Sequence, residues 1–214
     1  MGVKLTYSET ILLLGLDEQT GTLHALPKLT MRYALAGALL LELALANRID
    51  TDLHHLHLID TRPTGDPLLD EILQRLGTTD TELTTSVWLS ALANQTPDLQ
   101  EQVLQRLVDK GILRIEDRRI LWVFTSQHYK LTDDRWVRGV RDRLRALIDS
   151  DEIPDPDEAL LVALVDAFHL FDTLFTAEQM TRLRPRIKAL ARLDLIGREM
   201  AHTIRQISLA VMNQ

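Results

Sequence analysis

The sequence predicts a mainly α-helical fold, in which residues 1–214 form a single compact helical domain around a buried central helix, with one or two projecting β-hairpins. The strongest observation is the stretch 33–46, which consists of strong helix formers and is apolar around its whole circumference, so other helices must surround it. Elsewhere, most apolar residues recur at helical spacing, whereas patterns typical of strands are confined to two short regions. The central stretch is too short to span a bilayer, which needs about 20 apolar residues.

The composition is ordinary for a soluble protein, with 45% hydrophobic and 26% charged residues. A formal charge of −7 argues against bulk attraction to nucleic acid or to an anionic membrane, although it leaves room for a local basic patch. The chain has no cysteine, which excludes disulfides, thiol nucleophiles and thiolate metal sites. The first residues lack the features of a signal peptide, so a cytoplasmic location is expected.

The N-terminal third is predicted to contain two helices and a hairpin. The first helix runs from Leu5 to Leu16 with Ser8 as its N-cap, and Thr22 to Leu26 is a short extended piece. The central helix ends near Asn47, a residue type suited to a left-handed position after a helix. Partial alternation from Ile49 to Asp60 predicts a strand or hairpin.

The middle of the chain is predicted to be helical after a tight turn. Asp66 is a good N-cap and Pro67 suits the first helical position, so a helix is expected up to Gly77. Two further helices are expected, over Leu83 to Ala93 and Leu99 to Lys110. The buried side of the former is assigned to Val87, Trp88, Leu89 and Leu92.

The remaining elements are a hairpin and a set of helices. From Ile112 to Phe124, two short apolar runs flank a charged turn, which predicts a hairpin with Arg118 and Arg119 at its tip. The expected helices then run over Trp136–Ile148, Ala159–Phe175, Ala177–Leu193 and Ile196–Met212.

Three clusters of polar residues resemble active or metal sites but have simpler explanations. His54, His55 and His57 could bind a metal together with Asp52 and Asp60, yet a solvated hairpin edge explains them better, and we predict no metal site. Asp66, Asp70 and Glu71 lie at a helix start, where capping explains them. Glu42 needs a partner inside its apolar helix, for which Arg32, Arg48 or a backbone amide would serve. We therefore predict no catalytic residues and no cofactor.

Two basic features suggest binding functions. The helix Leu99–Lys110 followed by a hairpin has the order of a winged-helix module, in which Arg118 and Arg119 would contact nucleic-acid phosphates, but its polar face is partly acidic. The helix from Arg135 carries arginines at helical spacing along one side. Their guanidinium groups suit lipid phosphates, whereas the alternative is an ordinary solvated edge. These arginines are Arg138, Arg141 and Arg145.

Several stretches together resemble the Golgi phosphoprotein 3 family and its bacterial members. The most distinctive run is Pro63-Thr64-Gly65-Asp66-Pro67-Leu68-Leu69-Asp70-Glu71. Similar motifs occur in the same order before and after it, in 11–17, 36–45 and 107–113. The similarity extends from about Leu5 to Val211.

The resemblance implies a non-enzymatic, peripheral membrane adaptor that binds phosphatidylinositol 4-phosphate or another anionic phospholipid, with a client membrane protein and a self-associating hairpin. It also implies a cytoplasmic protein attached to the cytoplasmic membrane face. In the family the lipid site uses one tryptophan and three arginines, but the corresponding positions here are Leu26 or Pro27, Ala36, Pro97 and Gln100. Lys28 and Arg32, in the loop before the central helix, are candidates to replace the missing charge.

On this interpretation the hairpin is a membrane-insertion or self-association element. Trp122 and Phe124 would contribute through their aromatic rings, although both also suit a core. The alternatives are a winged-helix-like nucleic-acid binder and a protein-interaction scaffold that has lost lipid binding. Nucleic acid is the less expected partner.

Overall fold

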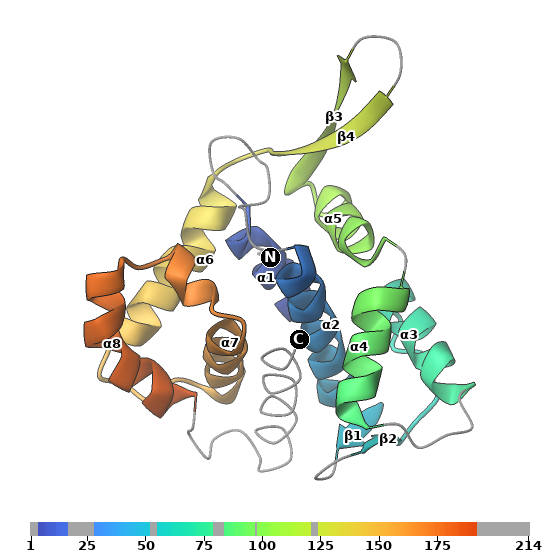
Figure 1. Ribbon diagram of the computed structural model, residues 1–214, viewed down its shortest axis with the longest axis horizontal. Coiled ribbons are helices and arrows are strands. Elements are labelled where there is room, and N and C mark those ends of the chain that lie inside the picture. The colour runs from blue at the N-terminus through green and yellow to red at the C-terminus, as the bar shows by residue number, and fades with distance from the viewer. Residues whose placement is uncertain are drawn as a thin grey trace.

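The computed structural model (Figure 1) describes residues 4–16, 28–51, 55–78, 84–96, 98–120 and 124–191, without the side chains of 28, 29, 51, 117–120 and 124–128. The elements in chain order are α1 Tyr7–Leu14, α2 Lys28–Leu45, β1 Ile49–Thr51, β2 Leu56–Leu58, α3 Pro67–Gly77, α4 Thr85–Gln95, α5 Leu99–Asp109, β3 Leu113–Ile120, β4 Phe124–Leu131, α6 Arg135–Asp149, α7 Pro156–Ala167, the 3-10 turn η1 Leu170–Thr173, and α8 Ala177–Leu190. The mainly α class with two hairpins is confirmed.

Helix α2 is the central helix that the sequence predicts. It packs against α1, α3, α4, α5 and α7, and Figure 1 shows it in the middle of the molecule. Ala34, Ala36 and Ala38 are fully buried, because small side chains let neighbouring helices approach closely. The helix begins at Lys28, several residues before the predicted start, and it ends before Asn47, whose φ of 53° confirms the expected left-handed position.

The helix starts show how local sequence sets these elements. For α3 the prediction is confirmed, because the Asp66 side chain accepts hydrogen bonds from the backbone N–H groups of Leu68 and Leu69. For α1 the predicted cap was wrong: Thr6 and Glu9 form a capping box, and Ser8 lies inside the helix. Ser8 is fully buried in the first turn, where a backbone N–H has no acceptor within its own helix and can bind a neighbouring one.

Helix α4 differs from its predicted burial at one position. It starts after the N-cap Thr84, and Trp88, Leu89 and Leu92 are buried as expected. Val87 is 46% exposed, so its assignment to the buried side was wrong. The buried positions follow the i, i+3, i+4 spacing, and Val87 falls just outside that stripe.

Both hairpins are antiparallel. Strands β1 and β2 confirm the first one, with Ile49 opposite Leu58. The second is longer than predicted, since β3 pairs with β4 from Leu113 opposite Leu131 to Ile120 opposite Phe124. The charged stretch up to Arg119 therefore belongs to β3 rather than to a turn, and Phe124 begins the return strand. Figure 1 shows this hairpin projecting from the rest of the molecule.

The described part of the chain after the second hairpin contains α6, α7, η1 and α8 (Figure 1). Helix α7 ends at Ala167, earlier than predicted, because His169 adopts a left-handed φ of 56° and η1 follows. The expected pieces Thr22–Leu26 and Ile196–Met212 lie outside the described residues. Within the described ranges, no helix is both long and apolar enough to cross a membrane.

Candidate functional site

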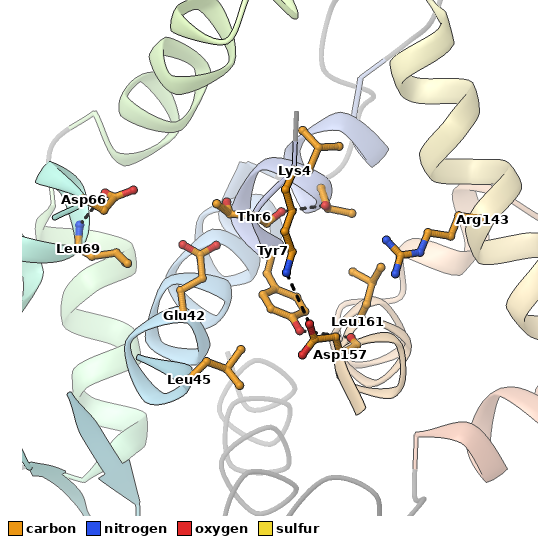
Figure 2. A pocket seen from close by; sticks show the side chains of 12 residues that line it. Lys4, Thr6, Tyr7, Glu42, Leu45, Asp66, Leu69, Arg143, Asp157 and Leu161 are labelled. Carbon is orange, nitrogen blue, oxygen red and sulfur yellow. Dashed lines mark hydrogen bonds and ion pairs between the residues drawn. The ribbon is translucent and has the colours of Figure 1, made fainter. Parts of the chain in front are cut away.

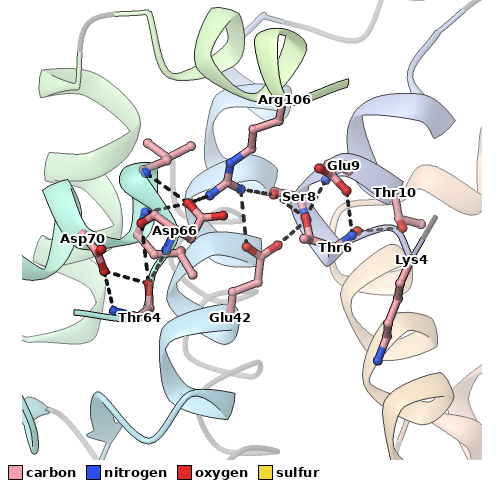
Figure 3. A network of polar contacts seen from close by, with 12 residues as sticks. Lys4, Thr6, Ser8, Glu9, Thr10, Glu42, Thr64, Asp66, Asp70 and Arg106 are labelled. Atoms are coloured by element: carbon pink, nitrogen blue, oxygen red, sulfur yellow. Dashed lines mark hydrogen bonds and ion pairs between the residues drawn. The ribbon is translucent and has the colours of Figure 1, made fainter. Parts of the chain in front are cut away.

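A buried carboxylate, Glu42, organises a polar network between four helices (Figure 3). Its Oε1 accepts a hydrogen bond of 2.7 Å from the backbone N–H of Ser8, in the first turn of α1. Its Oε2 lies 3.6 Å from Nη1 of Arg106 on α5, and the Glu42 side chain is only 8% exposed. The predicted backbone-amide partner is confirmed, but the charged partner is Arg106 rather than Arg32 or Arg48.

Arg106 connects this carboxylate to the start of α3. Its Nη2 donates to Oδ1 of Asp66, and its Nη1 donates to the Ser8 hydroxyl at 3.3 Å. The side chain of Arg106 is 14% exposed, so its planar guanidinium group joins two carboxylates in a largely dry setting. We call Glu42, Arg106, Asp66 and Ser8 the Glu42 network.

Two further contacts extend the same polar layer. Lys110 forms a 2.7 Å ion pair with Glu9, whose side chain is 1% exposed. The Asp70 side chain accepts hydrogen bonds from the backbone N–H and the hydroxyl of Thr64, and these bonds lower the pKa of Asp70. The distinctive run 63–71 thus serves to shape and cap the start of α3.

Burial raises the pKa of Glu42 above its ordinary value of 4.5, against the lowering effects of the Ser8 N–H and Arg106. Burial also raises the pKa of Tyr7, whose hydroxyl donates to the backbone oxygen of Asp157 at 3.3 Å. Raised pKa values of this kind occur at functional sites and in structural networks alike. Here, each charge of the Glu42 network has a partner within the fold, which favours a structural role.

A cavity of about 350 Å³ lies beside this network (Figure 2). Glu42 and Asp66 line one side of it, Leu45 and Leu69 contribute apolar surface, and Asp157 lines it from the first turn of α7. A second cavity of about 470 Å³ adjoins it, because both are lined by Lys4, Leu5, Thr10, Arg143 and Leu161. The two cavities together follow the start of α1 between α2, α6 and α7.

The predicted arginines of α6 lie on one flank of that helix, beside the buried stripe of Val137, Val140, Leu144 and Ile148. Arg138 is exposed and forms an ion pair of 2.6 Å with Asp134. Arg141 donates to the backbone oxygen of Leu16 at 3.4 Å, and Arg145 donates to that of Leu174 at 3.2 Å. Two of the three thus also tie α6 to neighbouring segments.

The other predicted residues are divided between α2 and the hairpin. Lys28 and Arg32 belong to the first two turns of α2, so their assignment to a loop was wrong. Arg118 and Arg119 lie in β3, opposite Ser126 and Thr125 and close to the hairpin end. Phe124 begins β4, whereas Trp122 lies outside the described residues.

The positions that correspond to the family's lipid site carry no positive charge in the described part. Ala36 is fully buried in α2, and Gln100 lies half-buried in the first turn of α5. Leu26, Pro27 and Pro97 lie outside the described residues. The winged-helix interpretation is weakened as well, since Arg106 of α5 is directed into the Glu42 network rather than toward a ligand.

Across the described segments, no group of three or more His, Cys, Asp or Glu side chains could hold a metal ion. The rings of His55 and His57 do approach each other, with centroids 6.3 Å apart, but Asp52 and His54 are not described.

Sequence reasoning missed Arg106, Arg135, Gly139 and Arg143. From the sequence, Arg106 belongs to the polar face of the predicted helix Leu99–Lys110, and only the fold brings it to Glu42. Arg135 and Arg143 line the larger cavity, whereas Arg138, Arg141 and Arg145 do not. The sequence did hold one indication of this pair, because a spacing of eight residues is close to two helical turns and brings both side chains near the same side of the helix.

Comparison with known proteins gives consistent results. The sequence profile of the family described as Golgi phosphoprotein 3 (GPP34) matches residues 8–207. Vacuolar protein sorting-associated protein 74 of Schizosaccharomyces pombe is 27% identical over 223 residues, which cover 89% of this chain and 65% of that protein. The protein of the same name from Eremothecium gossypii is 28% identical over 165 residues, 67% of this chain and 49% of its own length. The chain thus spans less than two-thirds of these relatives.

Proposed function

Because the chain belongs to the Golgi phosphoprotein 3 family, as its resemblance predicted, we propose that it is a non-enzymatic adaptor that attaches peripherally to a membrane and binds a client membrane protein. The lipid partner is an anionic phospholipid, with phosphatidylinositol 4-phosphate as the family's example. The name of the relatives, which refers to protein sorting, is in keeping with an adaptor role.

The observation that carries this proposal is the distribution of positive charge. The chain has a formal charge of −7, yet α6 contains five arginines against two aspartates. The hairpin strands β3 and β4 contain four cationic residues, counting arginine and lysine, against two acidic ones. Figure 1 shows that β4 leads directly into α6, so the two basic elements meet at one end of the molecule.

A membrane facing this end would meet the hairpin and one flank of α6. Each basic residue near an anionic surface contributes about 1 kcal/mol to attraction. Arg118 and Arg119 near the hairpin end, with Trp122 and Phe124, form the insertion or self-association element. Arg138, Arg141 and Arg145 are the headgroup candidates on α6, and Lys28 and Arg32 are those on α2.

Vesicle flotation tests this proposal. We expect binding to vesicles that contain phosphatidylinositol 4-phosphate or another anionic lipid, less binding at physiological than at low salt, and none to neutral vesicles. The double variant Arg118→Glu, Arg119→Glu should lower the affinity about tenfold or more, because two attractive charges become repulsive. The matched control, with the same change of charge, is Arg182→Glu with Lys188→Glu at two exposed positions of α8.

Equal loss in the control variant would show a response to net charge rather than to the hairpin end. No binding to any vesicle would overturn the lipid proposal and would leave the fold as a scaffold for protein partners. Nucleic-acid binding that weakens steeply with salt and depends on Arg118 and Arg119 would instead support the winged-helix alternative.

A further inference from the structure

The larger cavity, of about 470 Å³, differs in chemistry from the smaller one and is here called the basic cavity. Three cationic side chains line it: Lys4 before α1, and Arg135 and Arg143 on α6. Among the described residues that line it, none is acidic. Figure 2, drawn around the smaller cavity, shows Lys4 and Arg143 on facing sides, with the Lys4 ammonium directed at Asp157. A ligand in the basic cavity would therefore meet positive charge from two elements.

The rest of the lining is mainly apolar. Leu5, Val140 and Leu161 form its apolar wall, and all three belong to or pack against the core. Trp136 adds an indole ring, and the Arg135 guanidinium lies 5.6 Å from the centroid of that ring. Few charged groups around a mainly apolar wall is the usual composition of a small-molecule site. This combination suits a ligand with an anionic head and an apolar tail.

The three cations have partners that a ligand can replace. Lys4 lies 3.8 Å from Asp157, Arg135 3.1 Å from Asp133, and Arg143 3.2 Å from Glu158. The cationic side chains are 90%, 70% and 57% exposed, respectively. Ion pairs at such exposure contribute little, because water and salt screen them. A phosphate group, which accepts several charge-assisted hydrogen bonds, would compete well for the two arginines.

Gly139 lines the basic cavity at an exposed position and adds no side chain to it. It lies within α6, although glycine is disfavoured in a helix interior. A Cβ built at this position would meet no atom within 4 Å, so helix packing does not require glycine here. The backbone of Gly139 does not adopt a positive φ either, so its conformation does not require glycine. Since neither helix packing nor backbone conformation requires glycine at this position, what the missing side chain provides is free volume beside the cavity.

We propose that the basic cavity binds the phosphate headgroup of a single anionic phospholipid, with the start of the acyl chains against Leu5, Val140 and Leu161. This inference rests on the proposed membrane function and names a second lipid contact for it. Arg138, Arg141 and Arg145 do not line the site, and neither do those positions of the family's lipid site that the structure describes. Arg135 and Arg143 hold the phosphate, and Lys4 closes over it.

Calorimetric titration with dihexanoyl phosphatidic acid, below its micelle concentration, tests the proposal without a membrane. The unchanged protein should bind this lipid. Gly139→Leu should weaken binding about tenfold or more, because its side chain fills the cavity without a change of charge. Arg135→Gln with Arg143→Gln should weaken it similarly, and this pair keeps the test valid if Gly139→Leu fails to fold. The control Arg138→Gln, which removes an α6 arginine that does not line the cavity, should bind within about twofold of the unchanged protein.

Two further ligands distinguish the sources of affinity. Inorganic phosphate that binds as tightly as the lipid would overturn the role of the apolar wall. Dihexanoyl phosphatidylcholine that binds equally well would overturn the role of the cations. Equal loss in Arg138→Gln and in the Arg135, Arg143 pair would overturn the location.

Flotation of the same variants separates this inference from the proposed function. If the monomeric lipid binds but no anionic vesicle does, the cavity stands and the membrane proposal fails. If anionic vesicles bind but the monomeric lipid does not, the cavity proposal is overturned and the membrane proposal stands.

Discussion

The Glu42 network and the basic cavity both contain charged side chains around the start of α1, but they satisfy those charges differently. In the Glu42 network, Arg106 and Glu42 are 14% and 8% exposed and face each other across 3.6 Å. In the basic cavity, Arg135 and Arg143 are more than half exposed and pair with surface carboxylates. Charged side chains that are paired in the interior are fixed within the fold, whereas those that are paired at the surface are accessible to a ligand. The following substitutions test whether the two regions differ in this way.

The largest effect is expected from Arg106→Ala. It leaves the buried Glu42 carboxylate without its cation and removes the link to Asp66, so the free energy of unfolding should fall by about 3 kcal/mol. Urea denaturation measures this loss. The exposed control Arg135→Ala should change stability by less than about 1 kcal/mol. Equal losses in the two variants would remove the distinction between the two regions.

Next in size is Asp66→Ala, which removes the N-cap of α3 and one partner of Arg106. Loss of such a cap typically costs about 1 kcal/mol, and the lost ion pair adds to it. Asp66→Asn should recover part of the loss, since an amide oxygen still accepts from the N–H groups of Leu68 and Leu69. Thermal unfolding of both variants checks the order, and an Asn variant as unstable as the Ala variant would contradict the capping role.

These helix starts also show what could be predicted from sequence. The central helix, the cap of α3 and the antiparallel hairpins follow from local patterns, because apolar spacing and cap chemistry act within a few residues. The partners of Glu42 could not be identified in this way, since Arg106 is 64 positions away and only tertiary packing brings it close. The length of β3 was missed because its charged residues resemble a turn.

The candidate site was predicted less completely than the fold. The arginine-rich character of α6 was evident, but the sequence favoured Arg138, Arg141 and Arg145 because their spacing is regular. Which flank of an amphipathic helix borders a cavity depends on what packs beside it, here the segment around Lys4 and helix α7. The importance of Gly139 likewise emerges only from the empty space around it.

A smaller effect concerns pH. Since burial raises the pKa of Glu42 in the folded protein, the folded state binds more protons than the unfolded state between pH 4.5 and that raised value. The contribution of Glu42 to stability should therefore decrease as pH rises through this window and stay constant above it. Relative to the unchanged protein, Glu42→Gln should become progressively more stable over the same range. Urea titrations at several pH values measure this difference, and a difference of opposite slope would show that Arg106 and Ser8 outweigh burial.

The smallest effect is expected from Gly139→Ala. Alanine is favoured over glycine inside a helix, and its Cβ would meet no atom within 4 Å, so stability should rise by up to about 1 kcal/mol. A thermal melt of the variant is sufficient to measure this. A loss of stability would mean that the space beside Gly139 is not open.

The proposed membrane function requires that the hairpin end of the molecule faces an anionic membrane. Since the chain has no cysteine, single variants can each carry one environment-sensitive dye. We would place it at Thr125→Cys in β4 and at Arg182→Cys in α8, and record emission with anionic and neutral vesicles. We expect a blue shift for the hairpin probe with anionic vesicles alone, and little change for the α8 probe. A blue shift of the α8 probe without one of the hairpin probe would contradict this orientation at the membrane.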